Sequence, residues 1–143
     1  MTVLGIDYGA KKTGLAKSDD AEKMALPLAI IANTDQATLL ATLKKVCLEN
    51  DITKIVVGVP ISLASGQSQH MIREVDLQNQ QMQDVLAFVN WLASAIGLPV
   101  AVEDERLSTK QAQMMSRGAA KRGADDDVAA MLILQSFLDK LPR

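Results

Sequence analysis

The stretch Val3-Leu4-Gly5-Ile6-Asp7-Tyr8-Gly9 determines how the rest of the chain is interpreted. It is short and apolar and ends in Asp7-Tyr8-Gly9, which is typical of a buried strand that runs into a turn. Two further strands are predicted at Thr13 to Lys17 and at Ala25 to Ala32, the first of them directly after the turn. The opening of the chain is therefore predicted to be a β-meander.

Helical and extended patterns alternate after this meander. Apolar residues recur at helical spacing between Asp35 and Glu49, and Thr34 or Asp35 is a suitable N-cap for such a helix. The β-branched run from Ile55 to Val59 predicts a central strand covered on both faces. A polar loop is predicted from Ser62 to Asn79. It leads into a helix from about Gln80 to Ile96, closed by Gly97, whose apolar side carries Val85, Leu86, Val89, Leu92, Ala93 and Ile96.

The last predicted elements are a strand from Val100 to Val102, a short helix from Ser108 to about Ser116, a basic turn from Arg117 to Gly123 and a helix from about Asp125 to Leu141.

The order of these elements predicts an α/β fold in which a mixed central sheet has helices on both faces. The 143 residues, of which 48% are hydrophobic and 22% charged, suit one globular domain spanning residues 1–143. No apolar run approaches the roughly 20 residues that span a bilayer. The segment from Met1 to Leu4 also lacks the basic and apolar regions of a signal peptide. A cytoplasmic protein with no membrane partner is expected.

The residue content limits the kind of metal site and the kind of partner. Cys47 is the only cysteine and His70 the only histidine, so the chain has too few soft ligands for a zinc site. Any metal ion is therefore expected to bind oxygen. The formal charge of -2 and the pI near 5.3 argue against phosphate binding over the whole surface, so a nucleic-acid partner would need a local basic face.

Acidic residues lie where the predicted strands and helices begin or end. Asp7 follows the first strand, Asp104 and Glu105 follow the last strand, and Asp125 to Asp127 open the final helix. Ligands of open α/β sheets bind at this edge. A desolvated carboxylate is costly unless a cation compensates it, and Mg²⁺ binds carboxylates together with substrate phosphate oxygens. A pair of such ions can bind the attacking water and the leaving oxygen of a phosphodiester.

Each group of acids also has a purely structural interpretation. The role of Asp7 could be limited to accepting hydrogen bonds within its turn. The triplet from Asp125 to Asp127 could cap its helix and complement the helix dipole. Asp104 and Glu105 could form a solvated loop paired with Arg106. Taken one by one, these acids do not establish a metal site.

Basic residues accompany the same positions. A group of them would supply the local basic face if the fold brings them together, although any one of them could be an ordinary solvated side chain. Because only 3% of the residues are aromatic, contacts to phosphate are expected rather than stacking on bases. The residues concerned are Lys11, Lys12 and Lys17 near the first turn and Arg106, Lys110, Arg117, Lys121 and Arg122 near the other acids.

Four motifs in a fixed order cover nearly the whole chain. They are Gly5 to Ala16 (GIDYGAKKTGLA), Val56 to Pro60 (VVGVP), Asp104 to Thr109 (DERLST), and Asp126 to Ala130 (DDVAA) followed by Ile133-Leu134-Gln135. Together they resemble the YqgF (RuvX) family. The resemblance implies a ribonuclease H-like fold related to bacterial Holliday-junction resolvases. It also implies a nuclease that matures the 5′ end of pre-16S ribosomal RNA, with Mg²⁺ or Mn²⁺ as its cofactor.

The same resemblance assigns roles to individual residues. Asp7 would be the metal ligand of the first strand, Glu105 or Asp104 the second acid, and Asp126 the acid of the last helix. Asp126 and Asp127 each continue an apolar stripe of that helix, so periodicity does not separate them, and the family register favours Asp126. The predicted catalytic and metal-binding set is Asp7, Glu105 and Asp126, and the predicted substrate contacts are Lys11, Lys12, Arg106, Arg117 and Arg122. The segment from Ala64 to Gln81 looks longer than in the family and lacks its second glycine, which leaves substrate contacts there open.

Other functions remain open at this point. A junction resolvase that acts on branched DNA would use the same acids and the same basic face. A stable two-fold dimer would favour the resolvase interpretation. The oligomeric state expected here is a monomer or a weak homodimer. The stretch from Gly5 to Gly9 also resembles the phosphate loop of actin-like ATPases and sugar kinases, but those enzymes need two lobes and the chain supplies one. A non-catalytic RNA-binding module would be expected to have lost the acids, which this sequence retains.

Overall fold

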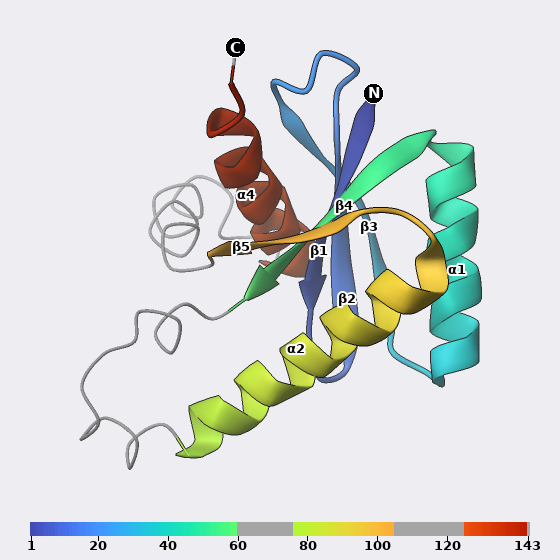
Figure 1. The fold of residues 1–143 in the computed structure, drawn as a ribbon, viewed down its shortest axis with the longest axis vertical. Coiled ribbons are helices and arrows are strands. Elements are labelled where there is room, and N and C mark those ends of the chain that lie inside the picture. Colours follow the sequence, from blue (N-terminus) through green and yellow to red (C-terminus); the bar gives the residue numbers. More distant parts are fainter. Residues whose placement is uncertain (60–75, 105–124, 143) are drawn as a thin grey trace.

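The computed structural model describes residues 1–59, 76–104 and 125–142 of the chain (Figure 1). The elements are β1 Thr2–Tyr8, β2 Lys12–Ser18, β3 Ala25–Ala32, α1 Gln36–Glu49, β4 Ile52–Val59, α2 Asp76–Ile96, β5 Val100–Asp104 and α4 Asp125–Asp139. The predicted helix at Ser108 to Ser116, the basic turn at Arg117 to Gly123 and residues 62–75 of the predicted loop lie outside the described residues.

The five strands form one mixed sheet in the order β3-β2-β1-β4-β5. β1, β2 and β3 pair antiparallel, which confirms the predicted meander. β4 and β5 each continue the sheet parallel to β1, with Ile6 paired to Val57 and Gly58 paired to Glu103. The carboxyl ends of β1, β4 and β5 therefore lie at one edge of the sheet, as parallel strands require.

Helices cover both faces of this sheet, which confirms the predicted architecture (Figure 1). On one face α1 and α2 pack on β1 and β4 through a cluster that includes Leu4, Ile6, Leu43, Val57 and Leu92. On the other face α4 is the one helix among the described elements that packs on the sheet, through a cluster that includes Val3, Val56, Ala130 and Leu134. Figure 1 shows that α4 runs opposite to β1, so that the first turn of α4 lies near the carboxyl end of β1.

Local chemistry explains where the helices begin and end. Of the two predicted N-cap residues, Thr34 and Asp35, the structure has Asp35 as the N-cap of α1. Its carboxylate accepts hydrogen bonds from the backbone N–H and the hydroxyl of Thr38. These bonds, chiefly the one from the Thr38 hydroxyl, lower the pKa of Asp35. Gly97 ends α2 with a φ of +78°, a left-handed conformation that favours glycine.

The structure corrects several predicted boundaries and one predicted helix face. β4 begins at Ile52, three residues before the predicted strand. α2 begins at Asp76, so residues 76–79 are helical rather than part of the predicted loop. β5 continues to Asp104, two residues beyond the predicted strand. Leu86 and Ala93 of α2 are exposed, whereas Phe88 is buried, because the helix turns a slightly different side toward α1 and β1.

Gly5 sets how closely α4 approaches the sheet. A Cβ atom at Gly5 would lie 2.7 Å from Cβ of Leu134 and 3.1 Å from the carbonyl oxygen of Ala130. Neither atom is the flexible end of a side chain, so relief requires α4 and β1 to separate. Glycine in a strand interior commonly marks such a close approach.

We therefore expect Gly5→Ala to destabilise the protein by about 2 kcal/mol, the range for an overpacked core. The measurement is the free energy of unfolding in urea. Gly97→Ala is the matched control, because a Cβ at Gly97 would meet nothing within 4 Å. It should cost only about 1 kcal/mol, from its positive φ. A Gly5→Ala variant as stable as the wild type would contradict the proposed tight contact.

Candidate functional site

The carboxyl edge of the parallel strands carries Asp7 of the predicted set and Asp104, the alternative to Glu105. Asp7 is the next-to-last residue of β1, and Asp104 is the last residue of β5 and pairs with Val59 of β4. Both residues thus lie near the carboxyl ends of parallel strands of one sheet. Glu105, the favoured second ligand, lies outside the described residues.

Asp7 is half-buried and lies on the α4 side of the sheet. Side chains alternate along a strand, so Asp7 shares its face with Gly5, whose α-carbon is in contact with α4. Leu4, Ile6 and Tyr8 belong to the opposite face, where they pack with the cluster under α1 and α2. The strand therefore directs the carboxylate of Asp7 toward the helix that carries the other predicted acid.

That helix, α4, begins at Asp125, so Asp126 and Asp127 belong to its first turn. The N-terminus of a helix carries a partial positive charge and unpaired backbone N–H groups, which favour negative charge nearby. Asp126 lies on the same stripe of α4 as Ile133, and Asp127 lies on the same stripe as Leu134. Ile133 and Leu134 are both buried. The fold therefore does not separate Asp126 from Asp127 any more than periodicity does.

Sequence reasoning missed Glu103 as a distinct feature of this edge. It is 5% exposed and lies in register with Gly58, on the α4 side of β5. Its Oε2 atom accepts hydrogen bonds from the Ser136 hydroxyl at 2.8 Å and from Lys140 Nζ at 2.6 Å. Ser136 lies in α4 and Lys140 directly follows it, four residues further on, a spacing that the sequence does show.

These bonds give Glu103 a structural role. A buried carboxylate is costly unless it is paired and hydrogen-bonded, and Glu103 has both an ion pair and a hydroxyl partner. It joins β5 to the C-terminal half of α4. Asp7 and Glu103 lie roughly 10 Å apart across β4, because neighbouring strands are about 4.8 Å apart.

Lys11 and Lys12 are exposed on the β1–β2 hairpin, next to Asp7. The hairpin is held by a hydrogen bond from Gly9 N–H to the Lys12 carbonyl at 3.0 Å. A Cβ at Gly9 would lie 2.6 Å from that carbonyl oxygen, so the turn requires glycine. Asn33 fastens the turn from the side: it donates to the Gly9 carbonyl, and its backbone N–H donates to the Lys11 carbonyl.

The other predicted basic residues do not extend this surface within the described residues. The prediction that Lys17 lies near the first turn is wrong. Its Nζ donates a hydrogen bond at 3.0 Å to the side chain of Asn50, the residue that follows α1. It lies at the far end of β2, paired with Leu4 rather than with the residues after Asp7. Arg106, Lys110, Arg117, Lys121 and Arg122 lie outside the described residues.

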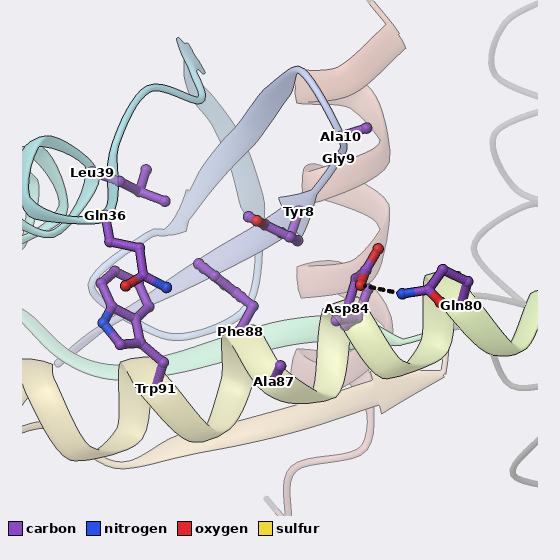
Figure 2. Close-up of a pocket in the computed structure, with 11 residues that line it drawn as sticks. Tyr8, Gly9, Ala10, Gln36, Leu39, Gln80, Asp84, Ala87, Phe88 and Trp91 are labelled. Carbon is purple, nitrogen blue, oxygen red and sulfur yellow. Dashed lines mark hydrogen bonds between the residues drawn. The ribbon is translucent and has the colours of Figure 1, made fainter.

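A cavity of about 660 Å³ opens on the opposite side of the β1 end, between α1 and α2 (Figure 2). Three of the four aromatic residues of the chain line it. The rings of Tyr8 and Phe88 stack with centroids 4.0 Å apart at 12°, and the ring of Trp91 lies 5.8 Å from that of Phe88. Composition gave no sign of this clustering, because it depends on tertiary contacts between β1 and α2.

The remaining soft ligand in the described part of the chain has a core role. Cys47 of α1 is buried, and desolvation raises the pKa of its thiol. Within residues 1–59, 76–104 and 125–142, no three histidine, cysteine, aspartate or glutamate side chains are grouped as a metal site. No helix of this described portion is long and apolar enough to cross a membrane.

Comparison with solved structures relates the fold to resolvases. RuvC of T. thermophilus in complex with a Holliday junction substrate matches 96% of this chain and 93% of that chain, with a TM-score of 0.56 and 19% identity. The resolvase of fowlpox virus in complex with Holliday junction DNA matches 100% of both chains, with a TM-score of 0.53 and 12% identity. At these identities the likeness shows a shared fold, which is the ribonuclease H-like fold that the sequence motifs imply.

Comparison of sequences gives the family. A protein of Rickettsia typhi named "Putative pre-16S rRNA nuclease" is 32% identical over 99% of this chain and 86% of its own length. A protein of the same name from Ehrlichia chaffeensis is 30% identical over 96% of this chain and 84% of its own length. The family model RuvX, described as Holliday junction resolvase, matches residues 1–140. The chain therefore belongs to the RuvX family and is an enzyme of the nuclease class.

Proposed function

We propose that this nuclease hydrolyses phosphodiester bonds in the 5′ region of pre-16S ribosomal RNA, in the cytoplasm, with a divalent metal ion held by Asp7, Glu105 and Asp126. The position of Asp7 carries the proposal: it is half-buried at the carboxyl end of β1, on the side of the sheet that α4 covers. The names of the relatives from Rickettsia and Ehrlichia support the choice of substrate.

Backbone geometry supports the pairing of Asp7 with Asp126. Gly5 meets α4 at Ala130 and Leu134, and Asp7 lies about 7 Å further along β1 on the same face, at about 3.3 Å per residue. Asp126 lies one turn, or about 6 Å, before Ala130 in α4. Because α4 runs opposite to β1, both displacements lead in the same direction (Figure 1). The two backbones are thus expected side by side at the edge where ligands of such sheets bind.

The donor chemistry fits a hard divalent cation. The candidate ligands are carboxylates, and Mg²⁺ and Mn²⁺ favour carboxylate and water oxygens. When bound, such an ion polarises the phosphodiester and lowers the pKa of a bound water. The chain itself contributes a fixed Asp7, held by a strand buried on both sides, and a helix N-terminus whose dipole favours an incoming phosphate.

Lys11 and Lys12 are proposed to hold the substrate backbone beside this site. Both are exposed on a hairpin that Gly9 and Asn33 hold in one shape, so their stems start from fixed positions. Lysine binds phosphate as a point charge and carries no base preference. These residues would therefore orient the strand and leave sequence selection to other contacts.

Branched DNA is the second candidate substrate, because the family model is described as Holliday junction resolvase. The two candidates share acids and basic residues, so the geometry at Asp7 does not separate them. Cleavage rates on a pre-16S 5′ leader and on a four-way DNA junction, measured with the same preparation, do. Faster cutting of the junction, at symmetric positions and by a dimer, would replace RNA with DNA in the proposal.

Replacement of Asp7 tests the chemistry. Asp7→Asn keeps the shape of the side chain but removes the charge that would hold the ion. If that charge stabilises the transition state by roughly 4 kcal/mol, cleavage of the leader in Mg²⁺ or Mn²⁺ should fall about a thousandfold. Thermal melting without metal should show a fold that is as stable or slightly more stable, because repulsion among clustered carboxylates is relieved.

Glu103→Gln is the matched control for this variant, since it neutralises another acid at the same level of the sheet. It removes the charge partner of Lys140 and should lower the melting temperature. It should leave the cleavage rate of the folded protein near that of the wild type. If Asp7→Asn cut the leader at the wild-type rate, or if Glu103→Gln alone lost activity, the acid assignment would be wrong.

The dependence of RNA binding on salt tests the role of the hairpin. With log Kd plotted against log salt concentration, each neutralised phosphate of single-stranded RNA contributes about 0.7 to the slope. Lys11→Ala together with Lys12→Ala should weaken binding of all sequences similarly and reduce the slope by about 1.4. Lys45→Ala, an exposed lysine on α1, should change neither quantity. A change in sequence preference instead would identify these lysines as base contacts.

A further inference from the structure

The aromatic cavity beside the proposed site has a lining that suits a planar, uncharged group. We propose that it binds one unpaired nucleobase of the strand whose backbone crosses the sheet edge at Asp7. The inference rests on the proposed function, since it concerns how the same substrate is held. It assigns base contacts to a surface separate from the acids and the hairpin lysines.

Three rings lie in the apolar lining of the cavity, together with aliphatic side chains such as Leu39 and Val85. Phe88 is 5% exposed, and its ring stacks on one face of the Tyr8 ring at a centroid distance of 4.0 Å. Tyr8 and Trp91 are only half-buried, so ring surface remains open to a ligand. Figure 2 shows Trp91 beneath Gln36 at one end of the cavity and Asp84 with Gln80 at the other. Stacking of a base on such rings tolerates any sequence, because every base has a π-face.

The polar groups of the lining discriminate between a base and a phosphate. They are the amides of Gln36 and Gln80 and the carboxylate of Asp84, which accepts a hydrogen bond from Gln80 at 2.9 Å. No lysine or arginine is among the described residues that line the cavity. An anion would meet the carboxylate with no described basic side chain in the lining to offset the repulsion, whereas the N–H groups of a base edge could donate to it. The cavity volume also lies within the range typical of small-molecule sites.

The place of the cavity in the chain connects it to the acids. Tyr8 directly follows Asp7, and the alternation of β1 sends the two side chains to opposite faces of the sheet. Gly9 and Ala10 form the rim, and Lys11 and Lys12 follow on the same hairpin. A strand with a phosphate at Asp7 can therefore pass over the hairpin and place a neighbouring base on the other side, between α1 and α2.

The test uses an RNA hairpin with a single-stranded extension and a second hairpin in which every nucleotide of the extension is abasic. Both have the same phosphates, so contacts to Lys11 and Lys12 are matched. Binding is measured with a chelator present, so that cleavage does not contribute. Trp91 is the only tryptophan of the chain, and its fluorescence reports directly on a stacked base.

We expect the intact extension to quench Trp91 and to bind roughly tenfold more tightly than the abasic one, as stacking of one base would give. The salt slopes of the two RNAs should be equal. Tyr8→Leu should remove most of the difference in affinity, whereas Tyr8→Phe, which keeps the ring, should retain it. Leu86→Ala, on an exposed part of α2 outside the cavity, should have no effect.

Two results would overturn the inference and are distinguishable from failure of the proposed function. Equal affinity and equal quenching with both RNAs would show that no base enters the cavity, while metal-dependent cleavage and salt-dependent binding would still support the nuclease assignment to RNA. A preference for the intact extension that Tyr8→Leu leaves unchanged would place the base elsewhere. If the wild-type protein bound neither RNA, the proposed RNA substrate would be contradicted as well.

Discussion

The contact between α4 and β1 at Gly5 is the constraint on which the rest of the structure depends. A helix that packs against a glycine in a strand approaches more closely than any side chain would allow. This contact fixes the height of α4 along the sheet, and with it the position of its first turn over the carboxyl edge. The remaining apolar contacts of α4, with Val3 and Val56 among others, then follow from that height. The tie from Glu103 to Ser136 and Lys140 holds the other half of the helix.

The end of β1 divides its two neighbouring side chains between different environments. Asp7 faces the side of α4, and Tyr8 stacks with Phe88 under α2. The period of two along a strand is the cause, since consecutive residues cannot share a face. A single strand end thus presents a carboxylate on one side and a ring on the other, and the exposed Lys11 and Lys12 follow on the adjoining hairpin. The proposed sites of phosphate chemistry and of base contact therefore lie on opposite faces of the sheet.

Most of the sheet could be predicted from the sequence because its strands are short apolar runs bounded by turn residues. Asp35 and Gly97 likewise have local chemistry that marks helix ends. What could not be predicted depends on contacts distant in sequence. The burial of Glu103 requires Ser136 and Lys140, and the grouping of Tyr8 with the rings of α2 requires the sheet to form first. The acids of the proposed site stand between these cases: motif order indicates them, while helix periodicity leaves Asp126 and Asp127 equivalent.

The position of α4 at the end of the element order has a consequence for synthesis of the protein. Every strand of the sheet emerges from the ribosome before the helix that covers one of its faces. Until then Val3, Ala16 and Val56 lack their apolar partner, which is the kind of exposed surface that promotes aggregation of nascent chains. The same order keeps Asp7 and the acidic first turn of α4 apart until the last helix docks. On the proposed assignment of Asp7 and Asp126, a nascent chain would thus have no cutting activity toward RNA before its fold is complete.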